Sequence, residues 1–247
     1  MPIVLITGAS SGLGLTFLKH YASVQPAPRI LAIDISPMPP KISELPNVEF
    51  YNIDITSDTS LRQLSMQIKG ERIDILIHSA GIRGLVPQIA KEKIGDVSAA
   101  ETYEAMDRET MVRTFEINTW GTFNLIKTFL PNLRLSGGQS DESVQAKIVI
   151  LSSRMGSISS NVGGGGYAYR TSKAALNAVV KSFAIDVPEV IFLLLHPGRV
   201  ETGLVAWKEE GAISPEESVY DCLKVIEKVT LEDSGTLVDR WGKAIGW

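Results

Sequence analysis

Two side chains in the third quarter of the chain have the types and spacing that proton transfer requires. Tyr169 and Lys173 are four residues apart in a segment whose pattern predicts a helix, so both side chains leave the same face. A cation beside a phenol favours the ionised phenolate, which lowers the phenol's pKa and suits it to donate and accept protons near neutral pH. The pair alone is weak support, because the same spacing also occurs in ordinary exposed surface pairs.

A glycine-rich turn near the N-terminus is the second candidate site. Gly8, Gly12 and Gly14 follow a predicted strand and open a predicted helix, with G-x-x-x-G-x-G spacing. Glycines there let backbone amides approach a pyrophosphate, which the helix N-terminus stabilises. The turn residues predicted to contact a dinucleotide are Gly8, Ser10, Ser11, Gly12, Leu13 and Gly14.

Two other interpretations of this turn stay open. The glycines alone would also suit a tight strand-to-helix turn without a ligand. Residues 8–12 moreover fit the G-x-S-x-G of a hydrolase nucleophile elbow, with Ser10 as the nucleophile. The hydrolase is the weaker alternative, because no loop before this first strand supplies an oxyanion hole and His196 is the only late histidine available as a base.

Asp34, at the end of the second predicted strand, bears on the choice of dinucleotide. A carboxylate at this position accepts hydrogen bonds from both hydroxyls of the adenosine ribose. A 2′-phosphate would be repelled, and neither Ser11 nor the following Ile35 and Ser36 offers a basic partner. The sequence therefore predicts NAD(H) as the preferred cofactor, with NADP(H) possible.

Apolar runs of strand length alternate with segments of helix length along the whole chain. This alternation is typical of an α/β protein with a parallel sheet covered on both faces. Strands are predicted at residues 3–7, 30–34, 48–53, 73–78, 147–152, 190–196 and 235–238. Helices are predicted at residues 12–24, 57–68, 108–133, 167–185 and 215–229. Residues 82–100 are predicted to be irregular, and residues 136–146 a surface loop.

Composition narrows the class of protein. The 247 residues are 44% hydrophobic and 21% charged, contain no linker or repeat, and suit one domain over residues 1–247. The net charge of −4 without a basic stripe argues against nucleic acid or an anionic membrane as partner. Cys222 is the only cysteine and the three histidines are scattered, so no metal site is expected. No apolar run approaches a membrane span, and we expect a cytoplasmic protein.

At this point the chain resembles the short-chain dehydrogenase/reductase family over essentially its whole length. Residues 7–14 are similar to the family's cofactor turn, and the other motifs follow in the family's order at matching strand ends. The resemblance implies a single Rossmann-fold domain, with a doubly wound parallel sheet of about seven strands and helices on both faces. The further positions that it assigns to the cofactor are Asp54 and Ile55 at the adenine, Ser79, Ala80 and Gly81 after the fourth strand, Pro197, Gly198, Val200 and Thr202 at the nicotinamide carboxamide, and Tyr169 and Lys173.

The resemblance also implies catalytic roles. Tyr169 would protonate the carbonyl oxygen during reduction, and Lys173 would bind the nicotinamide ribose. Together with the positive charge of the oxidised nicotinamide, Lys173 would lower the phenol's pKa by about 2–3 units. Ser153, or its neighbour Ser152, would orient the substrate oxygen. Asn118 would kink the long helix and support a chain of water molecules to solvent.

Two departures and one subgroup similarity accompany the resemblance. His78-Ser79-Ala80-Gly81 stands where the family has Asn-Asn-Ala-Gly, and the sixteen-residue gap from Ser153 to Tyr169 is slightly long. The glycine-rich run 160–166 and the preceding Ser-Arg-Met-Gly-Ser are similar to the C-factor-like and sniffer-like carbonyl reductase branch.

The expected activity is an NAD(P)-dependent oxidoreductase for a small carbonyl compound or secondary alcohol. The family implies a homodimer or homotetramer packed through helices 108–133 and 167–185. The alternative is a catalytically silent dinucleotide-binding sensor or scaffold. The presence of all four residues of the catalytic set favours the enzyme.

Overall fold

Apolar strand segments form a single parallel sheet at the centre of the molecule. A computed structural model describes residues 1–135, 145–205, 207 and 210–247, and its seven strands are ordered β3-β2-β1-β4-β5-β6-β7. The strands are β1 Ile3–Thr7, β2 Arg29–Asp34, β3 Val48–Asn52, β4 Ile75–His78, β5 Lys147–Leu151, β6 Ile191–His196 and β7 Thr236–Asp239. Every pairing in the sheet is parallel, so all carboxyl ends meet at one edge. The strand order reverses between β1 and β4, where sheets of this type bind their ligands.

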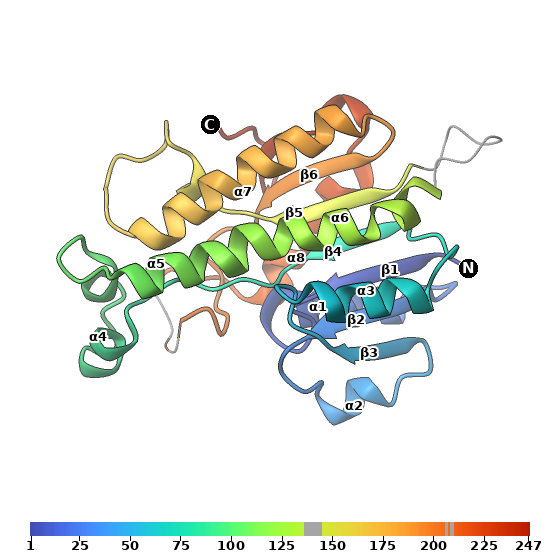
Figure 1. Ribbon diagram of the computed structural model, residues 1–247, viewed down its shortest axis with the longest axis horizontal. Helices are drawn as coiled ribbons and strands as arrows, with labels where there is room; N and C mark the ends of the chain where they lie inside the picture. The colour runs from blue at the N-terminus through green and yellow to red at the C-terminus, as the bar shows by residue number, and fades with distance from the viewer. Residues whose placement is uncertain (136–144, 206, 208–209) are drawn as a thin grey trace.

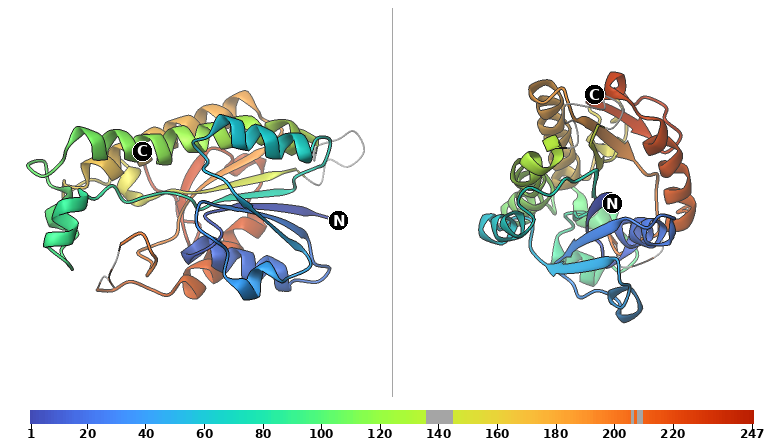
Figure 2. Two further views of the ribbon diagram at one scale, coloured as in Figure 1. Left: turned by 60° about the horizontal axis from the view of Figure 1, so that its bottom comes forward. Right: turned by 90° about the vertical axis from the view of Figure 1, so that its right-hand side faces the viewer.

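Helices cover both faces of this sheet. The longer ones are α1 Gly12–Ser23, α3 Asp58–Gln67, α5 Arg108–Phe115, α6 Gly121–Arg134, α7 Tyr167–Asp186 and α8 Pro215–Lys228. Helices α3, α6 and α7 pack on one face, while α1 and α8 pack on the other (Figures 1 and 2). Successive strand residues alternate between the two cores, as Leu5 and Ile6 do, because strand side chains point to opposite faces. The predicted α/β fold class, with seven parallel strands and two helical layers, is confirmed.

The long helix predicted over residues 108–133 contains an interruption. Between α5 and α6 the segment Glu116–Trp120 forms a π-turn, in which the backbone is wider than in an α-helix. Gly121 directly follows it, and a Cβ there would lie 2.8 Å from the Ile55 side chain. The absence of a side chain at Gly121 therefore lets the helix pass close to the segment after β3.

Other connections differ from the prediction in detail. The region predicted to be irregular over residues 82–100 contains the short helix α4 Pro87–Glu92 and most of η1 Ser98–Glu101, and the connection after β2 contains α2 Pro40–Ser43. Most of the predicted loop 136–146 falls on residues 136–144, outside the described residues. Within the described part of the chain, no helix has the length and apolarity needed to cross a membrane.

Candidate active site

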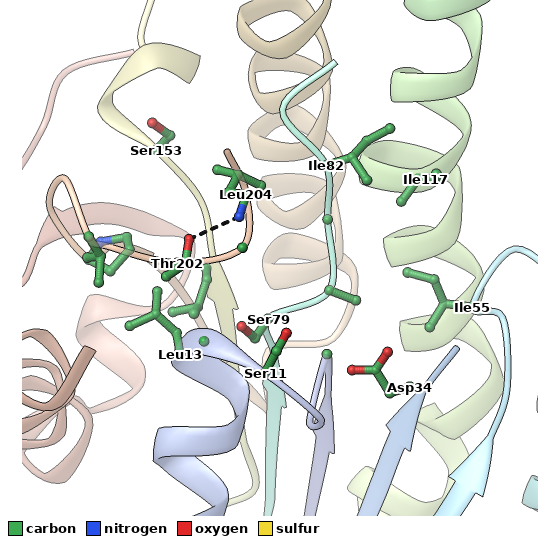
Figure 3. Close-up of a pocket in the computed structure, with 18 of the residues that line it drawn as sticks. Ser11, Leu13, Asp34, Ile55, Ser79, Ile82, Ile117, Ser153, Thr202 and Leu204 are labelled. Carbon is green, nitrogen blue, oxygen red and sulfur yellow. Dashed lines mark hydrogen bonds between the residues drawn. The ribbon is translucent and has the colours of Figure 1, made fainter. Parts of the chain in front are cut away.

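A cavity of about 430 Å³ opens at the carboxyl edge of the sheet, above β1, β2 and β4 (Figure 3). Most of the residues predicted from the sequence lie in its wall. These are Gly8, Ser11, Gly12, Leu13, Asp34, Asp54, Ile55, Ser79, Ala80, Gly81, Ser153, Tyr169, Lys173, Pro197, Gly198, Val200 and Thr202. Ser10, Gly14 and Asn118 lie outside the wall. The cavity therefore brings the predicted cofactor turn and the predicted proton-transfer pair into one space.

The glycine turn leaves no room for side chains. A Cβ on Gly14 would lie 2.1 Å from the Gly8 carbonyl oxygen, and Gly8 itself has a φ of +64° with the Ala80 amide 2.8 Å from a built Cβ. Ser11 caps α1 without a side-chain hydrogen bond, and the first turn of α1 carries no acidic residue. The backbone N–H groups of this turn thus suit a pyrophosphate, and the residues present fit a dinucleotide.

Ser10 and Asp34 form one hydrogen-bonded unit beside the turn. The Ser10 amide and hydroxyl both donate to Asp34 Oδ2, at 2.9 and 2.7 Å, and the Ser36 amide donates to Oδ1 at 2.9 Å. Figure 3 shows the Asp34 carboxylate between the turn that carries Ser11 and the side chain of Ile55. Because the Ser10 hydroxyl is bound to a carboxylate and lies outside the cavity wall, the geometry does not favour the hydrolase alternative.

Two more segments complete the cofactor side of the cavity. Asp54 is fixed by Thr56, whose amide and hydroxyl donate to Asp54 Oδ1 at 2.9 and 2.8 Å. Thr202 lies against the glycine turn, since a Cβ on Gly12 would be 3.2 Å from the Thr202 Cβ. The Thr202 hydroxyl accepts the Leu204 amide at 3.3 Å (Figure 3).

Tyr169 and Lys173 lie in the first two turns of α7, facing the cavity. Their exposed fractions are only 7% and 5%. The Lys173 Nζ lies 5.8 Å from the Tyr169 ring centroid and donates to the Leu151 carbonyl at 2.9 Å. Burial lowers the pKa of Lys173 to about 8. The neighbouring Tyr167 is 39% exposed and absent from the wall.

The direction of the Tyr169 pKa differs from the sequence-based expectation. Burial raises the pKa of Tyr169, and the opposing effects of the Arg83 guanidinium and the Ser153 hydroxyl leave it above its ordinary value. Desolvation penalises the phenolate more than these neighbours stabilise it. The lowered pKa expected with an oxidised nicotinamide alongside stays a prediction.

The two serines at the end of β5 point to different partners. The Ser152 hydroxyl donates to the Asn177 side chain at 2.6 Å and is buried beneath α7. The Ser153 hydroxyl instead accepts the Met155 amide at 3.1 Å, and it acts on the Tyr169 phenol, whose pKa it lowers. Of the two candidates, Ser153 is therefore the one that faces the phenol.

Asn118 lies in the π-turn and connects three elements. Its Oδ1 accepts the Ile82 amide at 2.8 Å, while its Nδ2 donates to the Ile82 carbonyl at 2.9 Å and to the Ser172 hydroxyl at 3.0 Å. These bonds hold the segment after β4 against α7. The side chain thus positions the cavity wall rather than forming part of it, and its predicted role in a water chain stays a prediction.

The histidines at the strand ends are neutral. His78 is buried between the hydroxyls of Thr7 and Thr122, at 2.7 and 2.8 Å, and burial lowers its pKa to about 3. His196 lines the cavity, and burial lowers its pKa to about 4. Its Nδ1 is buried and has no hydrogen-bond partner among the described residues.

Several residues of the site were not identified from the sequence. The cavity wall also contains Ile82, Arg113, Ile117 and Leu204, and an Arg83–Glu101 ion pair lies behind Tyr169. Arg83 follows the Ala-Gly of the β4 turn closely, so its place at the carboxyl edge could have been anticipated. Glu101 directly follows the region predicted to be irregular over residues 82–100, and nothing in the sequence indicated a place for it in the site. In the described part of the chain, no cluster of three or more His, Cys, Asp or Glu residues is arranged to hold a metal.

Comparison with known proteins agrees with this geometry. The profile of the short chain dehydrogenase family matches residues 2–212. The chain is 36% identical over 177 residues to the C-signal of Myxococcus xanthus, covering 71% of this chain and 93% of that protein. Among solved structures, the NADPH-bound carbonyl reductase from chicken fatty liver and the carbonyl reductase Sniffer of D. melanogaster each give a TM-score of 0.83 at 26% identity, with full coverage of both chains.

A family profile matched over most of the chain, together with relatives and structures of the same kind, settles the assignment. The cofactor turn, the switch-point cavity and the fold are those of a nucleotide-dependent oxidoreductase. The chain belongs to the short-chain dehydrogenase/reductase family of NAD(P)-dependent oxidoreductases, and it is similar in fold to carbonyl reductases.

Proposed function

We propose that this enzyme interconverts a small carbonyl compound and the corresponding secondary alcohol, with Tyr169 as the general acid and base. The observation that carries the proposal is the position of Tyr169. It is buried beside Lys173 and lines the same cavity as Ser153 and the glycine turn. A proton donor in this place can reach a carbonyl oxygen held next to a bound nicotinamide.

Each residue of the set then has a distinct task. The bound nicotinamide supplies or accepts the hydride. Tyr169 donates its phenolic proton to the carbonyl oxygen in reduction and removes the hydroxyl proton in oxidation. Ser153 donates a hydrogen bond to the same oxygen and orients it, and Lys173 stabilises the phenolate and binds the nicotinamide ribose. Asn118 holds the segment after β4 against α7. We also propose that it supports the chain of water molecules that returns protons to Tyr169.

We assign the adenosine ribose to Asp34 and therefore prefer NAD(H), with NADP(H) as the second possibility. The carboxylate is fixed by Ser10 and Ser36 and lies in the cavity wall, where a 2′-phosphate would meet its negative charge. The chicken carbonyl reductase is described with NADPH bound. In this fold, the residues at the end of the second strand contact the adenosine ribose and so decide between NAD(H) and NADP(H). In this sequence, neither the glycine turn nor the residues directly after β2 place a basic side chain next to Asp34.

The substrate side of the cavity favours an apolar carbonyl compound. Ile82, Ile117 and Leu204 contribute apolar side chains to the cavity wall (Figure 3). The segment 203–213 after Thr202 is short, so any lid over the cavity is small; residues 206, 208 and 209 lie outside the described part of the chain. We also propose that residues 1–247 act as one domain in the cytosol and assemble as a homodimer or homotetramer.

The test is a fluorescence titration with NADH and with NADPH, followed by oxidation of each against a panel of aldehydes, ketones and quinones. Tighter binding of NADH, with turnover of at least one carbonyl compound, is expected. A Gly14→Ala variant serves as the control that removes the cofactor turn. Binding without turnover across the panel would favour the non-catalytic sensor, and failure to bind either nucleotide would contradict the proposal.

A further inference from the structure

A buried ion pair lies against the ring of Tyr169. The Arg83 Cζ is 4.8 Å from the ring centroid, which is the geometry of a cation–π contact. The guanidinium forms a two-bond fork with the Glu101 carboxylate, with both N–O distances at 2.9 Å. The side chains are only 16% and 11% exposed, so water screens their charges weakly.

The same pair joins the segments that surround the phenol. Arg83 Nη1 approaches Met155 Sδ at 3.1 Å, two residues after Ser153. The Glu101 backbone carbonyl accepts the amide of Gly166, the residue before α7, at 3.0 Å. A Cβ on Gly166 would lie 3.6 Å from the Glu101 carboxyl carbon, so the start of α7 packs directly on the pair. The ion pair thus holds the Ser153 turn and the first turn of α7 together.

The charged groups around the phenol come from three elements. Arg83 extends from the segment after β4, Glu101 from η1, and Lys173 from α7 itself. The nearby His78, at the end of β4, is neutral. Arg83 stabilises the phenolate and Glu101 destabilises it, and the two effects lower and raise the pKa of Tyr169 respectively. The pair therefore acts on Tyr169 through charge as well as through position.

We propose that Arg83, held by Glu101, is a positioning residue for proton transfer by Tyr169: it fixes the ring and presents a positive charge to its face. The inference rests on the proposed role of Tyr169 as general acid and base. It assigns a function to a residue outside the Asn118, Ser153, Tyr169 and Lys173 set. Exchange of either charge in the pair should consequently shift the titration of the phenol, in opposite directions.

The experiment compares Arg83→Met with Glu101→Gln in both reaction directions. Alcohol oxidation needs the phenolate and rises with pH through the phenol's pKa, whereas carbonyl reduction needs the phenol and falls through it. The limb of the pH profile of kcat/KM that follows the phenol's ionisation should move to higher pH by about one unit in Arg83→Met. In Glu101→Gln the same limb should move to lower pH. Arg83→Lys, which keeps the charge without the fork, should leave the limb within about 0.3 units of the parent position.

A second readout separates this proposal from the proposed function. NMR of protein carrying isotope-labelled tyrosine, with Tyr169→Phe to assign the signal, follows the phenol without any turnover. Opposite displacements of this titration would support the Arg83 proposal even if no carbonyl substrate were turned over. The double variant Arg83→Met/Glu101→Gln leaves no unpaired buried carboxylate, so it replaces Arg83→Met if that variant fails to fold. The limb of its pH profile should fall between those of the two single variants.

A purely structural pair gives a different result. Both single variants would then lower kcat/KM at every pH and leave the limb and the phenol titration in place. That outcome would overturn the proposal, and so would a shift of the phenol titration in the same direction in both variants.

Discussion

At the residue scale, the site depends on two buried ionisable groups, Lys173 and Tyr169, which are 5% and 7% exposed. Lys173 donates to a backbone carbonyl and has a pKa of about 8, while burial keeps Tyr169 protonated. Each group is therefore held in the protonation state that suits a proton donor beside a developing alkoxide. Tyr169, Lys173 and Asp34 were identifiable from the sequence because spacing and strand ends fix their positions. The place of Arg83 near the carboxyl edge could have been anticipated, but its contact with Glu101 could not, because the two residues are eighteen positions apart in a part of the chain without a clear helical or strand pattern.

Asp34 carries the prediction on cofactor choice. Asp34→Arg replaces the carboxylate that should accept the ribose hydroxyls with a cation that favours a 2′-phosphate. The ratio of kcat/KM for NADPH to that for NADH is expected to rise by at least about tenfold, equivalent to about 1.4 kcal/mol. Ser36→Ala is the matched control, because it keeps the backbone amide that donates to Asp34. An unchanged ratio in Asp34→Arg would mean that the ribose is recognised elsewhere.

His78 makes stability depend on pH. Its pKa is 6.5 in the unfolded reference and about 3 in the folded chain, so the unfolded state binds the proton more readily. Stability should then fall as the pH drops below 6.5, by up to about 1.4 kcal/mol per pH unit from this group. Between pH 7 and pH 5, the free energy of unfolding of His78→Gln should fall by about 2 kcal/mol less than that of the parent. Urea unfolding at the two pH values measures this difference.

The control for His78 is Thr122→Val. It removes one hydrogen bond to the imidazole but keeps the ionisable group. It should lower stability at every pH while retaining the parent's pH dependence. Equal pH dependence in His78→Gln and the parent would show that His78 does not resist protonation.

At the element scale, glycines decide how closely the segments of the site approach one another. In α1 a Cβ on Gly14 would overlap the Gly8 carbonyl oxygen at 2.1 Å, whereas a Cβ on Gly163 meets no atom within 4 Å. Gly14→Ala should therefore cost about 3 kcal/mol or more of stability and weaken NADH binding at least tenfold. Gly163→Ala should change neither quantity in thermal unfolding or fluorescence titration. Parent-like NADH affinity in Gly14→Ala would contradict the proposed turn.

The strands and longer helices follow from the sequence, because runs such as residues 3–7 and 190–196 are apolar throughout and bounded by turn residues. The π-turn at Glu116–Trp120 does not follow from the residue pattern, which stays helical; only the family resemblance implied a kink there, at Asn118, whose side chain bonds to Ile82 and Ser172. The short helices α4 and η1 were missed for the same kind of reason. Their placement depends on contacts such as the one between the Val86 amide and the Ala100 carbonyl.

At the scale of the whole molecule, apolar side chains remain exposed along one helical face. Val112, Phe115 and Trp120 of the α5–α6 segment are 40–51% exposed, and Trp120 stacks on Phe123, which contacts Phe183 of α7. This exposed face matches the proposed assembly through the two long helices. Trp120→Glu should convert the oligomer to smaller species in light scattering, while Tyr220→Glu on α8, at 65% exposure, should not. A monomeric parent would contradict the assembly.

The central claim is that Tyr169 transfers the proton, and one comparison tests it most directly. Tyr169→Phe and Tyr167→Phe remove the same hydroxyl from two positions of α7. Tyr169 is buried in the cavity wall, whereas Tyr167 lies outside the wall and is 39% exposed. With a substrate found in the panel, Tyr169→Phe should lower kcat by more than about three orders of magnitude and keep NADH affinity, while Tyr167→Phe stays close to the parent. If Tyr169→Phe retains a tenth of the parent's kcat, the account of proton transfer is wrong.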